Sequence, residues 1–87
     1  MSENYRILEK KWLTKNPLRQ WRVDNGLFQK DLGASIGVGY HTIFRWESGM
    51  SSPNDAQMKE LVQLTKDKNL QEKYEKWQLD RPKFGKE

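Results

Sequence analysis

Apolar residues along this chain recur at intervals of three and four, which is the period of an α-helix with one buried face. Sustained alternation of β-branched and polar residues, the signal of a half-buried strand, is absent. The pattern therefore predicts an all-α fold of five or six helices. The predicted helices span residues 3–14, 17 to a stop at Gly26, 29–36, 40–47, 55–66 and 70–79.

Capping residues divide the chain between these helices. Ser2 is the predicted cap of the first helix, and Asn16 followed by Pro17 predicts the start of the second. Gly49 ends the fourth helix, and Pro82 closes the last one. We expect a helical N-terminal extension, a central domain, one further helix and a tail, with boundaries at 1–15, 16–66, 67–79 and 80–87.

The composition indicates one small domain with aromatic anchors. The chain has 87 residues, and about a fifth are Leu, Ile, Val or Phe, close to the level below which disorder is common. Four Trp and three Tyr residues compensate, since each buried aromatic side chain removes roughly 150–250 Å² from water.

The scarcity of certain residue types argues against several classes of function. Cysteine is absent and a single histidine is present, so thiolate metal sites and histidine clusters are excluded. The Ser, Asp and Glu residues lack a suitable basic partner, so we expect no enzyme activity, no catalytic residue, no metal and no cofactor. Neither a membrane-length apolar run nor a signal-type N-terminus is found, which favours the cytoplasm.

The charge balance permits nucleic acid as a partner without requiring it. The net charge is +4 and the isoelectric point is about 9.4. Residues 16–49 carry four basic and three acidic groups. Function in this segment must therefore depend on particular side chains and not on a dense basic patch.

Residues 29–47 contain the most informative spacing in the chain. Two short helices need apolar residues on facing sides, a small residue where they touch, and a turn residue that tolerates positive φ. These demands are met by Leu32, Ile36, Val38, Ile43, Trp46, Gly33 and Gly37. The combination predicts a helix-turn-helix.

With these residues in place, residues 17–66 resemble the phage-repressor and Cro-like helix-turn-helix proteins, also called the XRE family. The resemblance extends upstream and downstream of the motif, through Leu18, Trp21, Arg22, Gly26, Leu27, Glu47, Gly49, Pro53, Met58, Leu61 and Val62. It implies a lambda-repressor-like domain.

The resemblance also implies a function. Members of this family bind duplex DNA, usually as dimers, with the second motif helix in the major groove. It therefore implies a sequence-specific transcriptional regulator, a repressor, with DNA contacts from Gln29, Gly39, Tyr40, His41, Thr42 and Arg45. In that role Arg45 would donate two hydrogen bonds to guanine, Thr42 would reach a phosphate or a thymine methyl, and Gln29 would contact a phosphate.

Three positions depart from the family pattern. Phe28 stands where a Ser or Thr cap is usual, and Gly33 stands where alanine is usual. The loop at residues 48–53 has no Lys or Arg. We therefore expect modest nonspecific affinity and modest salt dependence.

Other residues allow two interpretations. The resemblance implies that Arg22 and Glu47 form a structural, partly buried ion pair between helices. Phe44 either covers the fifth helix or contacts DNA. The basic residues at 6, 10, 11 and 15 form either a solvated face or a DNA-binding arm.

The expected oligomeric state depends on the last predicted helix. Leu70, Tyr74 and Trp77 lie on one face at helical spacing. This stripe either packs on Tyr5, Leu8 and Trp12 or pairs with a second copy, and we expect a weak homodimer. The alternative function is a protein-interaction adaptor that keeps the fold, binds a protein partner and does not read DNA.

Overall fold

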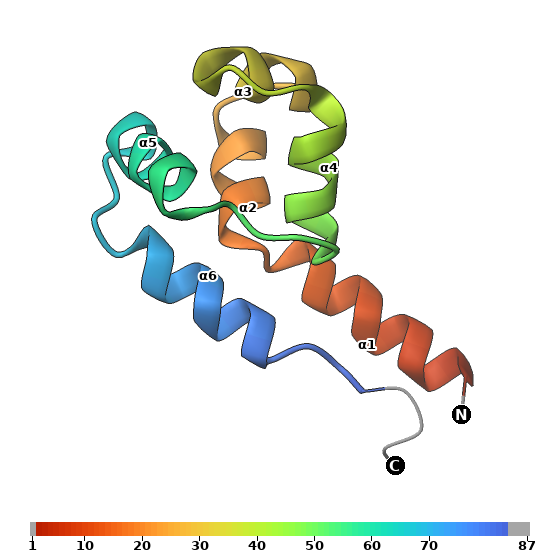
Figure 1. The fold of residues 1–87 in the computed structure, drawn as a ribbon. Coiled ribbons are helices and arrows are strands. Elements are labelled where there is room, and N and C mark those ends of the chain that lie inside the picture. Colours follow the sequence, from red (N-terminus) through yellow and green to blue (C-terminus); the bar gives the residue numbers. More distant parts are fainter. Residues whose placement is uncertain (1, 84–87) are drawn as a thin grey trace.

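The computed structural model describes residues 2–83, and within them the chain forms six α-helices and no strand (Figure 1). The helices are α1 (Ser2–Thr14), α2 (Pro17–Asp24), α3 (Gln29–Ile36), α4 (Tyr40–Ser48), α5 (Asp55–Thr65) and α6 (Leu70–Leu79). The predicted all-α fold is confirmed. Residues 84–87 of the predicted tail lie outside the described residues.

The helix bounds differ from the predicted ones by a single residue at three ends. Helix α1 begins at Ser2, so Ser2 belongs to the helix and is not its cap. Helix α4 continues through Ser48. Helix α5 ends at Thr65 because Lys66 has a left-handed conformation, with φ of 58°.

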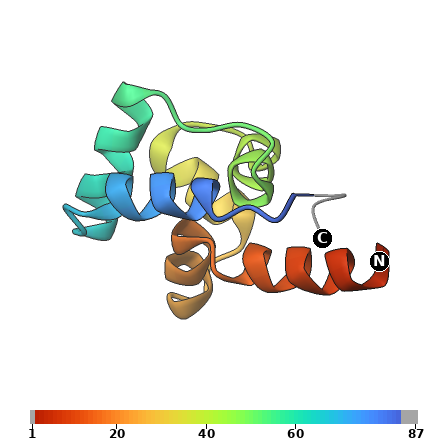
Figure 2. The same cartoon turned by 90° about the horizontal axis from the view of Figure 1, so that it is seen from below.

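Helices α2 to α5 surround the centre of the molecule, and α6 packs against α2 and α5. Helix α1 projects to one side and runs in the opposite direction to α6, and the C-terminal ends of these two helices lie near each other (Figures 1 and 2). Eleven apolar or aromatic side chains form the core: Trp12, Leu18, Leu32, Ile36, Ile43, Trp46, Met58, Leu61, Leu70, Tyr74 and Trp77. Aromatic residues contribute much of its volume, as the composition predicted.

Asn16 connects the two halves of the fold. Its side-chain oxygen accepts hydrogen bonds from the backbone N–H groups of Leu18 and Arg19, at 2.8 and 3.0 Å. Its amide group donates to the carbonyls of Trp46 and Glu47, at 3.1 and 3.2 Å. The predicted cap is confirmed, and the same side chain also ties the start of α2 to the end of α4.

The predicted homodimer surface is wrong. Leu70, Tyr74 and Trp77 are only 2–4% exposed, because this stripe faces the core of its own chain. The indole of Trp77 stacks on that of Trp12 with ring centroids 4.0 Å apart. The other interpretation, packing against α1, holds for Trp12, whereas Leu8 remains 54% exposed.

The paired indoles join the two ends of the chain by reciprocal hydrogen bonds. Trp12 donates its Nε1–H to the carbonyl of Trp77 at 2.6 Å, and Trp77 donates to the carbonyl of Trp12 at 2.7 Å. Buried indole N–H groups need such acceptors. We call this arrangement the tryptophan clasp.

Candidate nucleic-acid interface

A tight glycine-dependent turn sets the angle between α3 and α4. Gly37 has a φ of 76°, a left-handed conformation that favours glycine. A Cβ atom on Gly33 would lie 2.5 Å from the carbonyl oxygen of Val38, so the backbones approach too closely for a larger residue. Both glycine roles predicted from the sequence are confirmed.

The inner face of α4 is held by apolar packing and by an ion pair. Ile43 and Trp46 are at most 2% exposed. Beside them, Glu47 accepts hydrogen bonds from Nε and Nη2 of Arg22, at 2.6 and 2.9 Å. The remaining Nη1 of Arg22 donates to the carbonyl of Leu27 at 2.8 Å. The predicted structural ion pair is confirmed. It holds α4 to α2 and, through Arg22, to the loop that follows α2.

Opposite this inner face, α4 presents its polar and aromatic residues to solvent. Tyr40 and His41 stack on each other with ring centroids 4.0 Å apart, and both are exposed. Arg45 is exposed one turn further along the helix, and its guanidinium makes no hydrogen bond or ion pair with another described residue. Gly39 is exposed directly before the helix, and Thr42 is partly buried.

Gln29 begins α3 but has a structural contact of its own. Its side-chain amide donates to Oε1 of Glu47 at 3.2 Å. The carboxylate of Asp31 accepts a hydrogen bond from the N–H of Phe28 at 2.8 Å, whereas Phe28 itself offers no side-chain cap. The first-turn N–H groups of α3 therefore lack a side-chain acceptor and remain suited to an anion.

Three features near this surface were not predicted. Phe28 is 69% exposed and shares a shallow depression of about 550 Å³ with Arg22, Gln29, Lys30 and Tyr40. The sequence shows the aromatic residue at the cap position, but its proximity to Tyr40 depends on how α3 and α4 cross.

The second feature is a basic residue at the loop after α4. Arg81 donates to the carbonyl of Gly49 at 3.1 Å, and its guanidinium lies 5.1 Å from the ring centroid of Trp12. The loop at 48–53 has no basic residue of its own, but the end of the chain brings one to it. No local sequence signal indicates this contact, because the two residues are far apart in the chain.

The third feature is the placement of Phe44, which is 48% exposed. It lines a shallow depression with Leu13, Arg19, Gln29, Glu47 and Ser48. None of these residues belongs to α5, so the interpretation that Phe44 covers the fifth helix is not supported.

Comparison with known sequences agrees with this geometry. The sequence profile of the helix-turn-helix family matches residues 18–72, which is more than half of the chain. The chain belongs to the helix-turn-helix family. As a member, this helix-turn-helix protein has the fold of the XRE-type, DNA-binding regulators. No curated protein and no solved structure matches the chain.

Two kinds of feature are absent from the described residues of this helix-turn-helix protein. Within residues 2–83, none of the helices combines the length and apolar character needed to span a bilayer. The same part of the chain has no group of three or more His, Asp or Glu side chains placed to hold a metal ion.

Proposed function

We propose that the protein is a sequence-specific regulator of transcription that binds duplex DNA and inserts α4 into the major groove. One observation carries this proposal. The inner face of α4 is fixed by Ile43, Trp46 and Glu47, whereas Tyr40, His41 and Arg45 on the other face are exposed. A rigid helix with unengaged hydrogen-bonding side chains is suited to reading base edges.

Each residue has a distinct role in the proposed complex. Arg45 donates two parallel hydrogen bonds to a guanine, and Tyr40 and His41 contact neighbouring bases as one stacked unit. Gly39 and Thr42 approach the sugar–phosphate backbone at the start of α4. Gln29 contributes its backbone N–H to a phosphate, because its side chain is engaged by Glu47.

We further propose that the regulator acts as a repressor. Occupancy of an operator blocks access of other proteins to that DNA and needs no surface beyond the DNA-binding one. A reporter gene downstream of the selected site tests this sign, since repression lowers its expression and activation raises it.

Selection from a pool of random duplexes tests the DNA-binding proposal. We expect enrichment of a consensus that contains a guanine, with binding that weakens only modestly between low and moderate salt. Each phosphate contact adds about 0.9 to the slope of log affinity against log salt, and the exposed cations near α4 are few. Enrichment of no sequence would contradict the proposal.

A second function is favoured by the apolar side chains around the motif. Phe28, Tyr40, Phe44 and Met50 are each about half exposed or more, and such side chains are typical of protein interfaces. A protein-interaction adaptor would use them to hold a partner. Failure to select a consensus, together with tight binding of a protein at this surface, would favour the adaptor.

A further inference from the structure

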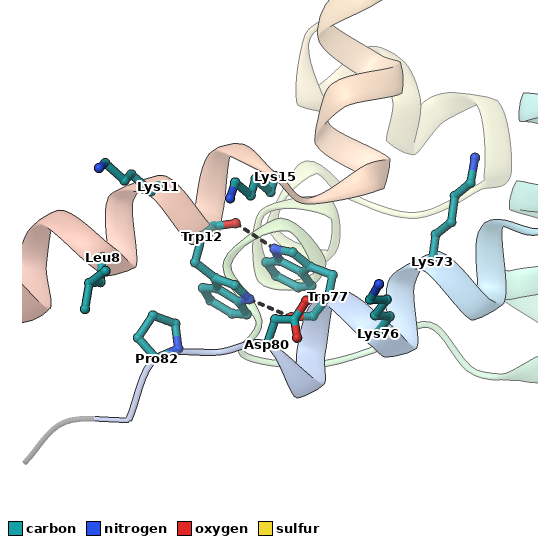
Figure 3. A pocket seen from close by; sticks show the side chains of 9 residues that line it. All are labelled: Leu8, Lys11, Trp12, Lys15, Lys73, Lys76, Trp77, Asp80 and Pro82. Carbon is teal, nitrogen blue, oxygen red and sulfur yellow. Dashed lines mark hydrogen bonds between the residues drawn. The ribbon is translucent and has the colours of Figure 1, made fainter. Parts of the chain in front are cut away.

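A groove runs between α1 and α6, at the end of the molecule away from the start of α4. It encloses about 550 Å³ and is lined by Leu8, Lys11, Trp12, Lys15, Lys73, Lys76, Trp77, Asp80 and Pro82 (Figure 3). The volume lies within the range of sites that hold small ligands or short peptide segments. The tryptophan clasp forms its floor and ties its two walls together.

The walls of the groove are strongly positive. Four lysines line it against one carboxylate, that of Asp80. Lys73 pairs with Asp67 at 2.7 Å, and this contact holds the pKa of Asp67 below its ordinary value. Lys11, Lys15 and Lys76 form no ion pair with any residue in the described part of the chain. Like charges held around one concavity favour an anionic occupant.

The groove also has an apolar element that a simple anion would not use. Leu8 is 54% exposed at one end, close to Pro82 on the opposite side of the groove (Figure 3). A phosphate group gains nothing from this apolar edge. A peptide gains from both features, because an apolar side chain can cover Leu8 while carboxylates meet the lysines.

We propose that the groove between α1 and α6 binds an acidic segment of a partner protein that carries an apolar anchor. A second copy of this chain is a poor occupant, since two such grooves facing each other would bring eight lysines together. The groove lies near the end of α4 at Gly49, which Trp12 and Arg81 approach. The proposed base-reading residues extend from Tyr40 to Arg45, which lie roughly 13 and 6 Å from Gly49 along the helix axis.

Selection from a displayed library of random peptides tests this proposal. The library is selected on the wild-type protein and depleted on a Lys11→Glu, Lys76→Glu variant. We expect the enriched peptides to be rich in Asp and Glu and to share one apolar position. Enrichment of peptides without an acidic bias, or of none, would overturn the proposal.

Matched variants locate the binding of the enriched peptides, measured by fluorescence anisotropy. We expect affinity about tenfold weaker in the Lys11→Glu, Lys76→Glu variant and unchanged in Lys10→Glu, Lys59→Glu, whose lysines are exposed outside the groove. Leu8→Asn should weaken binding, whereas Ile7→Asn, at a neighbouring residue of similar exposure, should not. Equal loss in each pair would show that the peptides bind elsewhere.

Duplex DNA provides the remaining arm of the test. All four variants change exposed residues, and their melting temperatures are checked first. Lys11 and Lys76 lie in the last turns of α1 and α6, where an acidic side chain opposes the helix dipole, so Lys11→Gln, Lys76→Gln serves as a milder pair. We expect the groove variant and its control pair to bind DNA equally. If only the groove variant loses DNA affinity, the lysines contact phosphates and the partner proposal is wrong.

Discussion

The two ends of this molecule are built in different ways. At one end, α3 and α4 are neighbours in sequence, and their crossing depends on Gly33, Gly37 and a few apolar residues close by. At the other end, α1 and α6 are joined by Trp12 and Trp77, which are 65 positions apart. The first end exposes aromatic rings, a histidine and an arginine. The second exposes lysines around a groove.

The geometry of the first end is specified by residues close together in sequence, whereas the geometry of the second end is specified by residues far apart in sequence. The motif needs particular residues at fixed short spacings, so its geometry is encoded over fewer than twenty residues. The tryptophan clasp needs only that two amphipathic helices each present a tryptophan. The sequence of either helix alone does not indicate which surface its tryptophan will pack against. Substitutions at the two ends should therefore differ in how much they change the free energy of unfolding.

The largest effect is expected at the ion pair that supports the motif. Glu47 is 5% exposed and accepts two hydrogen bonds from Arg22. Glu47→Ala leaves the partly buried guanidinium without its counter-charge, and we expect a loss of up to about 3–5 kcal/mol in the free energy of unfolding. Denaturant unfolding measures it. Glu60→Ala, at an exposed position of α5, should change it by less than about 0.5 kcal/mol.

A smaller effect is expected at the clasp. Trp12→Phe removes the Nε1–H that donates to the carbonyl of Trp77 and leaves part of the stacked volume empty. The expected loss is about 1–3 kcal/mol, from the hydrogen bond and the cavity together. Trp21→Phe, at a partly buried tryptophan outside the stack, is the control. Equal losses in both variants would mean that the clasp adds nothing beyond ordinary burial.

The start of α3 should gain stability from a cap. Phe28→Ser supplies the side-chain oxygen that the native residue lacks, and we expect an increase of about 1 kcal/mol in the free energy of unfolding. Phe28→Ala removes the same exposed ring without adding a cap, so it should bring no gain. Thermal unfolding compares the two variants. If the alanine variant gains as much as the serine variant, the ring and not the missing cap destabilises α3.

The last stability effect depends on pH and involves Tyr74, whose hydrogen bond connects α6 to α4. Tyr74 donates a hydrogen bond to the carbonyl of Trp46. Burial, with a contribution from the charge of Glu47, raises the pKa of Tyr74 above its ordinary value. The unfolded chain loses this proton first, at about pH 10. Stability from this group is therefore complete below pH 10 and is lost as the pH rises further.

Comparison with Tyr74→Phe isolates this contribution. The melting temperature of the wild type should fall more steeply above pH 10 than that of the variant, because phenylalanine has no proton to lose. Parallel curves for the two proteins would assign the alkaline loss to other groups.

The sequence predicted the motif well because its constraints are local. The bounds of α3 and the left-handed turn at Gly37 follow from residue types at fixed spacing, whereas the Arg22–Glu47 pair was implied by the family resemblance. The cap at Asn16 was likewise predicted from the Asn-Pro pair, but the hydrogen bonds of Asn16 to the end of α4 could not be predicted.

The rest could not be predicted because it depends on which surfaces meet. The stripe of Leu70, Tyr74 and Trp77 is compatible with a core or with an interface. The outcome depends on the packing of α6 against α2 and α5 and on the position of Trp12. The contact of Arg81 with Gly49, the depression at Phe28 and the lysine groove likewise join residues without any shared local pattern.

The exposed face of α4 is proposed to read bases, and Arg45 tests this proposal most directly. The affinity of the wild type and of Arg45→Ala is measured on the selected duplex and on duplexes with each base pair changed in turn. For the wild type, changing the contacted guanine should cost about 1–3 kcal/mol, and the variant should have lost this preference at that position alone. Arg6→Ala, at an exposed arginine on α1, should retain it. An Arg45→Ala protein with the full wild-type base preference would contradict the account.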